Sequence, residues 1–390
     1  MREKAPAYLA GAAAATSTVS IAASQILLGA AILSLLLNRS KLRWPPVTLP
    51  LLLFMGWTLV SLAASPEPRA GFPQVKKFYE YAMLFAVFSA IRTLREVRWV
   101  VWGIITGASL SALWAMQQFA RIYQNNPTLF YYVYSNGARV TGFMAHWMTF
   151  SGITMMALLL AAALVLFDRR SWLLFAAIGA MGAGLLAGYQ RTMWAGTAMG
   201  SMWLLWARKR WLVALVPVAA AVVLAASPLL RDRVLAAFQP QQNIVNSTEH
   251  RAALRAAGWE MIKAHPLVGV GPEQVSVRLL DYVPAGVRSP WPTEWSKGHL
   301  HNVYYQYAAE RGLPALAALL WFLGRALYDF FRALRSSKTE GRWMLQAALA
   351  TILAMMVAGL AEHNMNDSEP LGVFLAILAC GYAVRETQTS

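Results

Sequence analysis

Charge is scarce in this sequence. Only 13% of the 390 residues are Asp, Glu, Lys or Arg, whereas a soluble domain typically has about 25%. Hydrophobic residues make up 58% of the chain. This balance excludes a disordered or fibrous chain and argues against a soluble globular enzyme, because a surface this apolar needs lipid as its solvent.

Cysteine and the common nucleotide and metal motifs are also missing. Cys380 is the single cysteine, which excludes an internal disulfide and Cys-based metal sites. It lies in an apolar stretch and is predicted to be a small core residue. The sequence has no P-loop, dinucleotide-binding glycine fingerprint, Gly-x-Ser-x-Gly elbow or His-Glu-x-x-His motif. We therefore expect no cofactor.

Apolar segments are abundant, and many approach the roughly 20 residues that cross a hydrocarbon core. The uncharged stretches are 5–38, 44–66, 99–120, 146–167, 171–190, 192–207, 211–230, 312–324, 343–361 and 370–384, and 78–91 is interrupted only by Glu80. As one helix, residues 5–38 would extend about 51 Å. That is too long for one upright span, so the stretch is either one kinked helix or two short ones. Two are favoured, because only a double crossing puts Arg2 and Lys4 on the same side as the basic clusters described next.

Basic clusters orient these segments. They lie in alternate short connections, at Arg39/Lys41/Arg43, Arg92/Arg95/Arg98, Arg169/Arg170, Arg208/Lys209/Arg210 and Arg332/Arg335/Lys338/Arg342. The positive-inside rule makes those connections cytoplasmic. The sequence thus predicts an all-α polytopic membrane protein with about twelve transmembrane helices. Helices one to nine would occupy residues 1–227 and helices ten to twelve residues 301–390, with one large outer loop over 228–300.

The outer loop contains a helical pattern. Over residues 249–264, Leu254, Ala257 and Met261 share one face. We interpret this segment as an amphipathic helix lying at the membrane surface. It ends at the sequence His-Pro-Leu-Val-Gly-Val-Gly-Pro at 265–272, called the glycine-rich run below, since proline and glycine break helices.

The net charge of +16 comes from 34 basic and 18 acidic residues. The basic residues of the cytoplasmic connections are explained by topology, whereas those predicted on the outer side need another explanation. Arg191 lies between two apolar stretches with almost no loop. An arginine at bilayer depth costs about 2.5–3.5 kcal/mol, so an anion ligand is favoured over a snorkelling side chain. Arg139 fits a solvated loop residue or a second anion ligand equally well. Arg251 and Arg255, four residues apart on one helix face, could both reach one phosphate group or lipid headgroups.

All six histidines fall on the predicted outer side, where a side chain titrating near neutral pH could transfer protons. His301 is the favoured general base, because it opens a helical run in which Tyr304 and Tyr305 follow three and four positions later. The alternative is a hydrogen-bonding histidine at a helix end. His299 is a weaker candidate, and Asn302 is a further candidate beside His301.

A polar turn at 362–369 groups His363 with three carboxylates. Oxygen-rich ligands could hold a divalent ion there. The turn has no Asp-x-Asp pair, so pairing of its carboxylates with outer arginines is favoured and no metal is predicted. Nucleic acid is not expected as a partner, because the basic residues lie at the two membrane faces.

Four motifs carry a family resemblance. They are Gln-Arg-Thr-Met-Trp around Arg191, Arg-Val-Thr-Gly-Phe-Met around Arg139, Arg251 followed by Trp259 and the glycine-rich run, and His301-Asn302-Val-Tyr-Tyr-Gln with Glu310-Arg-Gly312 after it. With the predicted topology, they make the chain resemble the bacterial O-antigen ligases, within the O-antigen ligase/polymerase membrane superfamily. The motifs do not separate ligase from polymerase.

The resemblance implies a function in lipopolysaccharide biosynthesis. Such enzymes transfer a polysaccharide from undecaprenyl pyrophosphate to a sugar of the lipid A core oligosaccharide, at the periplasmic face of the bacterial inner membrane. They invert the anomeric configuration, use neither metal nor ATP, and resemble glycosyltransferases of the C type. By motif, Arg191 would hold the pyrophosphate, His301 would be the base, and Arg251 or Arg255 would join the phosphate site.

Three alternatives stay open at the level of sequence. An O-antigen polymerase or a protein O-oligosaccharyltransferase would use the same donor with another acceptor. A secondary transporter would place its site near the bilayer midplane between repeats. The candidate residues instead cluster at one face and no repeat is evident, which favours a transferase whose partners are the lipid-linked glycan, the lipid A core and membrane lipids.

Overall fold

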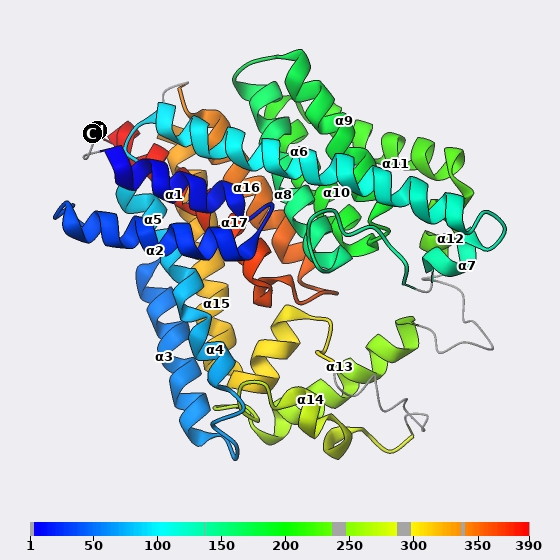
Figure 1. Ribbon diagram of the computed structural model, residues 1–390. Coiled ribbons are helices and arrows are strands. Elements are labelled where there is room, and N and C mark those ends of the chain that lie inside the picture. Colours follow the sequence, from blue (N-terminus) through cyan, green and yellow to red (C-terminus); the bar gives the residue numbers. More distant parts are fainter. Residues whose placement is uncertain (1–3, 136, 236–246, 287–297, 337–339, 390) are drawn as a thin grey trace.

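The computed structural model describes residues 4–135, 137–235, 247–286, 298–336 and 340–389, and the regular elements of these residues are all helices (Figure 1). The α-helices are α1 (Ala5–Thr16), α2 (Ile21–Leu37), α3 (Thr48–Ala64), α4 (Phe72–Lys76), α5 (Phe78–Ala90), α6 (Leu94–Asn125), α7 (Phe130–Ser135), α8 (Trp147–Phe167), α9 (Trp172–Ala187), α10 (Arg191–Arg208), α11 (Leu215–Ala226), α12 (Pro228–Leu235), α13 (Ser247–Ala264), α14 (Val275–Arg278), α15 (Val303–Ser336), α16 (Arg342–Ala358) and α17 (Ser368–Thr389), with short 3-10 helices η2 (Arg210–Ala214), η3 (Leu279–Tyr282) and η4 (Asn364–Asn366). The predicted all-α class is confirmed.

Four helices among the described residues are long and apolar enough to cross a membrane, namely Leu94–Asn125, Trp147–Phe167, Val303–Arg335 and Ser368–Thr387. A fifth span is possible if Arg210–Ala226 and Pro228–Leu235, bent by 111°, count together. Shorter apolar helices add to the bundle. The chain is therefore a membrane protein, whereas the count of twelve spans and the division at residues 228 and 300 stay predictions.

The first apolar stretch forms two helices, as the charge pattern favoured. α1 and α2 pack against each other and lie side by side in Figure 1. The side chain of Ser20 accepts a hydrogen bond from the Ala23 amide and so caps the start of α2. α1 buries small residues, Ala10 and Ala13 among them, and this lets neighbouring backbones approach closely, as small residues do in membrane bundles.

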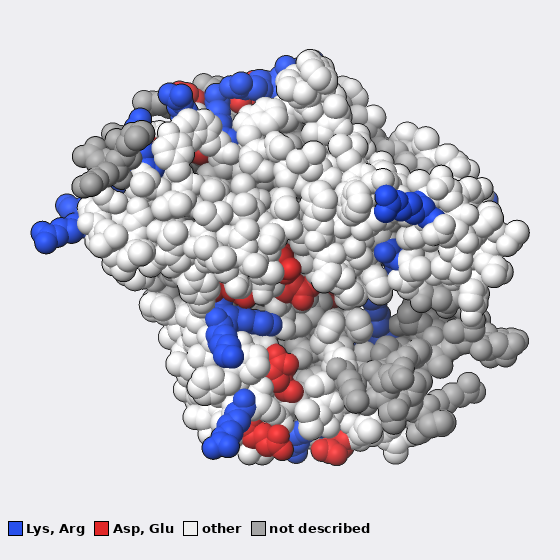
Figure 2. Space-filling model, in the orientation of Figure 1, with Lys and Arg blue, Asp and Glu red and all other residues white. Residues whose placement is uncertain are grey.

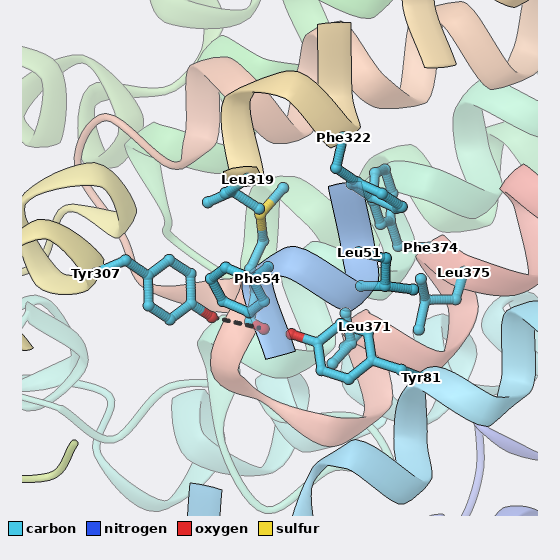
Figure 3. Close-up of a pocket in the computed structure, with 10 residues that line it drawn as sticks. Leu51, Phe54, Tyr81, Tyr307, Leu319, Phe322, Leu371, Phe374 and Leu375 are labelled. Atoms are coloured by element: carbon cyan, nitrogen blue, oxygen red, sulfur yellow. Dashed lines mark hydrogen bonds between the residues drawn. The ribbon is translucent and has the colours of Figure 1, made fainter. Parts of the chain in front are cut away.

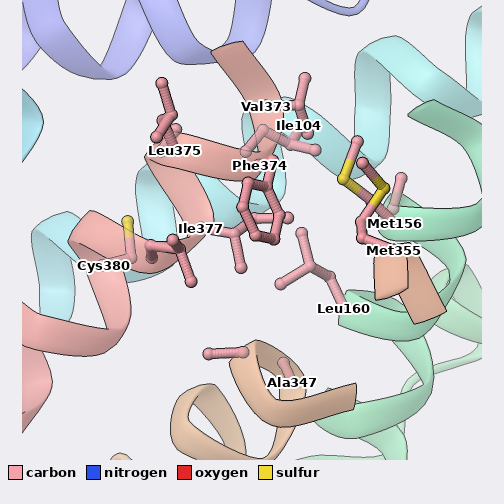
Figure 4. Packing of buried hydrophobic residues seen from close by; sticks show 14 of the residues in the cluster. Ile104, Met156, Leu160, Ala347, Met355, Val373, Phe374, Leu375, Ile377 and Cys380 are labelled. Carbon is pink, nitrogen blue, oxygen red and sulfur yellow. The ribbon is translucent and has the colours of Figure 1, made fainter. Parts of the chain in front are cut away.

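The centre of the bundle lies where α6, α8, α16 and α17 meet (Figure 4). The side chains that interdigitate there include Ile104, Met156, Leu160, Ala347, Met355, Phe374 and Ile377. Cys380 lies in the same packing and is fully buried. The prediction that this cysteine is a core residue is confirmed.

A smaller lobe lies below the bundle in Figure 1 and contains α13, α14, η3 and the first turns of α15. The helix predicted over 249–264 is present as α13. Its apolar residues Leu254, Ala257 and Met261 are buried, and they share a core with Leu300 and Ala308. This face therefore packs against protein, whereas the position of α13 at the membrane surface stays a prediction. The loop segments 236–246 and 287–297 lie outside the described residues.

Figure 2 shows how charge is distributed on one face of the molecule. Most of this surface carries neither acidic nor basic side chains. Lys and Arg gather along the upper edge, and residues of both signs gather at the indentation between the bundle and the lobe. The candidate site lies where bundle and lobe meet.

Helix α15 is broken near its start. Gly312 has φ 78° and ψ 172°, outside the helical region, and Pro314 follows two residues later. Proline has no amide hydrogen, so the Glu310 carbonyl loses its helical donor. The break also parts the Leu313 amide from its helical acceptor, the Ala309 carbonyl. Three backbone groups therefore need partners from elsewhere in the fold.

The glycine-rich run supplies these partners. The amides of Val270 and Gly271 donate to the carbonyls of Ala309 and Glu310, at 2.8 and 2.9 Å. The Leu313 amide donates at 2.8 Å to a carbonyl at the start of the same run. The run thus replaces the helical hydrogen bonds that the break removes, and it fixes the first turns of α15 at an angle to the rest.

Candidate functional site

The site is built around the buried carboxylate of Glu362, in the turn after α16. One oxygen, Oε1, lies 2.5 Å from a terminal nitrogen of Arg251 on α13. The other, Oε2, lies 3.3 Å from Nδ1 of His301 at the start of α15. Glu362 is fully buried, whereas the Arg251 side chain is 22% exposed and that of His301 23% exposed. One carboxylate therefore joins two candidates that the sequence could only name separately.

Asn302 positions this arrangement. Its Oδ1 accepts the amides of Tyr304 and Tyr305, at 2.9 and 3.0 Å, which caps α15. Its Nδ2 donates to the carbonyl of Leu360 at 2.8 Å. These hydrogen bonds connect the start of α15 to the turn that carries Glu362. Asn302 therefore positions the site and is not expected to contact substrate.

His301 lies just before the helix and not on it. Its φ of 49° is in the left-handed region, which is unusual for a residue other than glycine. The predicted helical register from His301 to Tyr304 and Tyr305 is therefore wrong. The Tyr304 hydroxyl donates to the Met356 carbonyl at 2.8 Å, and Tyr305 packs against the core of the lobe. Both tyrosines hold α15 in place.

Two further histidines stand beside His301. The ring of His299 lies 4.4 Å from that of His301 and 5.5 Å from that of His363, between centroids. Burial, helped by the charge of His301, lowers the pKa of His299 to about 4. Burial also holds the pKa of His363 well below its ordinary value. Both rings are therefore neutral near pH 7. His301 is the histidine that contacts the Glu362 carboxylate.

Glu362 itself is ionised. Burial would raise the pKa of this carboxyl, but the hydrogen bond from His301 and the charge of Arg251 outweigh burial and hold the pKa below the ordinary 4.5. The sequence of this turn predicted that its carboxylates pair with arginines. The pair Arg251–Glu362 confirms that prediction and also separates Arg251 from Arg255, because Arg251 is the one that reaches the carboxylate.

His299, His301 and Glu362 could in principle converge on a metal ion, since their ligand atoms lie within 4.8 Å of one another. The negative charge of the ionised carboxylate is already balanced by the positive charge of the Arg251 guanidinium, 2.5 Å away. A divalent cation would stand beside that guanidinium and lose the negative charge it needs. The residues present do not fit a metal.

A group of arginines surrounds Tyr189, just before α10. The guanidinium carbons of Arg139 and Arg233 lie 5.5 and 4.9 Å from the centre of the Tyr189 ring. A terminal nitrogen of Arg191 donates to the Arg233 carbonyl at 3.2 Å. Arg139 also stands over Trp147, at 5.1 Å. We call Arg139, Arg191 and Arg233 the arginine group.

The arginine group is crowded with positive charge. Burial and the neighbouring charge of Arg233 lower the pKa of Arg139 to about 10. The negative charge of Glu362 acts on all three members of the group. Cations held this close are poised for a multiply charged anion, because guanidinium groups bind phosphate oxygens in pairs.

An apolar groove of about 460 Å³ leads to this group. It runs between α10 on one side and α11 and α12 on the other. Its walls include Trp194, Ala198, Ala219, Val223 and Leu230, and Arg191 is the charged residue in the lining. Alanines on the facing helices have small side chains and so provide the space of the groove. Every residue of α11 is exposed or half-buried. The groove therefore suits a long apolar chain with an anionic end.

A second cavity, shown in Figure 3, can be set aside. It lies between α3, α5, α15 and α17, and apolar side chains line it together with Tyr81 and Tyr307. Its volume of about 20 Å³ is enough for about one water molecule. The Tyr307 hydroxyl donates to the Met365 carbonyl at 3.4 Å. It is a packing defect and not a substrate site.

Three site residues were missed as functional candidates by the sequence reasoning: Glu362, Arg233 and Tyr189. Glu362 was considered only as one carboxylate of a polar turn, either pairing with an arginine or holding a metal, although an acid directly after an apolar span was a usable signal. Arg233 was not named as a candidate. Tyr189 was not singled out, since its φ of 58° is visible only in the structure.

Comparison with known proteins agrees with the motifs. Residues 176–320 match the family model described as O-Antigen ligase. The matched segment contains Arg191, Arg251, the glycine-rich run and His301, whereas Arg139 and Glu362 lie outside it. No curated protein matches the chain. The resemblance drawn from the sequence is confirmed, and the fold adds Glu362 and Arg139 to the matched residues.

Proposed function

We propose, from the premise that residues 176–320 belong to the O-antigen ligase family, that this membrane protein is an O-antigen ligase. It would transfer a polysaccharide from undecaprenyl pyrophosphate to a hydroxyl of the lipid A core oligosaccharide, at the periplasmic face of the bacterial inner membrane. The observation that carries the proposal is the apolar groove lined by Arg191, which is hydrogen-bonded to Arg233 within the arginine group. An apolar chain with a pyrophosphate end has the matching chemistry.

The arginine group would act on the leaving group. As the bond between the anomeric carbon and the phosphate oxygen breaks, its electron pair stays with the oxygen, and negative charge grows on the lipid pyrophosphate. Arg139, Arg191 and Arg233 stand ready to stabilise that charge in a partly buried setting, where preorganised cations act most strongly. No covalent enzyme intermediate is required.

His301 would act on the nucleophile. The acceptor hydroxyl oxygen attacks the anomeric carbon opposite the leaving group and inverts its configuration. The hydroxyl proton passes to His301, whose Nδ1 faces Glu362, so Nε2 is the nitrogen that takes it. A positioned base of this kind contributes about 10²–10⁴-fold. The proton on His301 and the charge on the lipid pyrophosphate balance the step.

Replacing Arg191 tests the donor site. In Arg191→Ala we expect affinity for undecaprenyl pyrophosphate to fall about 10- to 100-fold, the loss of one charged hydrogen-bond donor. Binding to the purified protein in lipid nanodiscs measures it. Arg208→Ala is the matched control, because Arg208 lies exposed at the other end of α10. Unchanged donor affinity in Arg191→Ala would remove this residue from the site.

Chelation tests the absence of a metal requirement. Because Arg251 already neutralises Glu362, we expect glycan transfer by the purified protein to proceed at the same rate with and without EDTA. A rate that falls with EDTA and returns on addition of a divalent cation would contradict this expectation. The measurement needs no variant.

A further inference from the structure

The Glu362 carboxylate serves two partners that have different tasks. Arg251, on α13, is separated from Glu362 by 111 residues and comes from the lobe. His301, on the other oxygen, is the proposed base. The charge of this carboxylate is thus shared between a cation of the lobe and the histidine.

The bond between Arg251 and Glu362 is open to competition. The Arg251 side chain is 22% exposed, so an incoming anion can reach it. Its charge acts on both Arg191 and Arg233, which places it within electrostatic range of the arginine group. A pyrophosphate has more charge and more acceptor oxygens than one carboxylate, and a guanidinium binds such oxygens in pairs.

We propose that Arg251 changes partner when the donor binds. Its guanidinium leaves Glu362 for the pyrophosphate, and the Glu362 carboxylate then serves His301 alone. This exchange rests on the proposed function, because it takes the lipid pyrophosphate as the ligand. Glu362 is a positioning residue in it, acting through His301 and not on the substrate.

The exchange couples donor binding to proton transfer. The charged and titratable groups around His301 and Glu362 are Arg251, His299, His363, His146, Asp367 and the arginine group. Departure of Arg251 removes the cation closest to the carboxylate. An unshared carboxylate stabilises the positive charge that the His301 ring gains when it takes the acceptor proton. Proton transfer is therefore favoured once the donor is seated.

Glu362→Gln provides the test, since the amide keeps the shape and loses the charge. Arg251 is then free before the donor arrives. We expect the variant to bind undecaprenyl pyrophosphate about tenfold more tightly, while kcat for transfer falls about tenfold or more. The full-length protein in nanodiscs is used for both measurements. A purely structural role for Glu362 would weaken binding and turnover together.

Two variants control this result. Glu369→Gln removes another carboxylate of the same turn and should leave donor affinity and kcat unchanged. The double variant Arg251→Ala/Glu362→Gln should bind the donor no more tightly than Arg251→Ala, because no guanidinium is left to be freed. The cycle thus assigns any gain in affinity to the pair Arg251–Glu362.

The pH profile of Arg251→Ala gives a separate readout that does not depend on the folding of Glu362→Gln. A base must be unprotonated, so kcat/KM for the donor rises with pH through the pKa of the base. Removal of Arg251 should move this acid limb to higher pH, because the carboxylate is then unshared. An acid limb that stays in place or moves to lower pH contradicts the exchange.

The outcomes separate the two proposals. Donor binding by Glu362→Gln that is equal to or weaker than that of the wild type overturns the exchange and leaves the proposed function standing. Failure of the wild-type protein to bind undecaprenyl pyrophosphate overturns the proposed function itself. Tighter binding with slower turnover in Glu362→Gln supports both.

Discussion

His301→Ala is expected to abolish glycan transfer while donor binding remains. The ring of His301 lies 3.3 Å from the ionised carboxylate of Glu362, and no other histidine has this contact among the described residues. Loss of a positioned base lowers the rate about 10²–10⁴-fold. The donor is bound by the arginine group, so its dissociation constant should change little. Single-turnover transfer and donor binding, measured on the same preparation, check both halves.

His265→Gln is the matched control for this experiment. His265 is also predicted to lie on the outer side, but its Nε2 lies 2.7 Å from the Tyr282 hydroxyl in the lobe and not beside Glu362. Its replacement should leave the rate of transfer close to that of the wild type. Normal transfer by His301→Ala would remove His301 as the base, and weaker donor binding in that variant would assign it to the donor site.

Gly312→Ala is expected to prevent folding of the native structure. A methyl group at this position would lie 1.9 Å from the Leu267 carbonyl oxygen, and the φ of 78° with ψ of 172° belongs to a region that only glycine adopts freely. Relief would require the glycine-rich run to leave the start of α15. We expect destabilisation of at least about 3 kcal/mol, measured as loss of folded yield and of thermal midpoint in detergent.

Gly324→Ala is the control, because Gly324 lies in the same helix and an added methyl group meets nothing within 4 Å. Alanine is the better helix former by roughly 1 kcal/mol, so this variant should match or exceed the wild type in stability. Equal stability of Gly312→Ala and Gly324→Ala would contradict the structural role of the glycine-rich run in holding the start of α15.

Periodicity was enough to predict part of the local structure. The helix α13, its buried residues Leu254, Ala257 and Met261, and the core position of Cys380 follow from spacing and composition. The length of residues 5–38 excluded one upright span, and the charge pattern then favoured two helices. The period of a helix does not say what covers its apolar face, so burial of the apolar face of α13 in protein could not be predicted.

The site needed tertiary structure. Spacing put Arg251 and Arg255 on one helix face and gave no reason to choose between them. The structure shows that Arg251 is the one that pairs with Glu362, which lies 111 residues away in the sequence. The contact between Glu362 and His301 spans 61 residues. The helical register proposed for His301 failed for a local reason, because left-handed backbone at this residue is not visible in an apolar pattern. Arg191 was identified from sequence since an arginine between apolar stretches is costly without a partner.

Reconstituted transfer tests the central claim most directly. The purified protein, undecaprenyl-pyrophosphate-linked glycan and lipid A core oligosaccharide would be combined in liposomes, and the products separated by mass. We expect glycan on the lipid A core together with released undecaprenyl pyrophosphate, and neither product with His301→Ala. Glycan that lengthens on the lipid carrier while the lipid A core stays unmodified would contradict the assignment as a ligase.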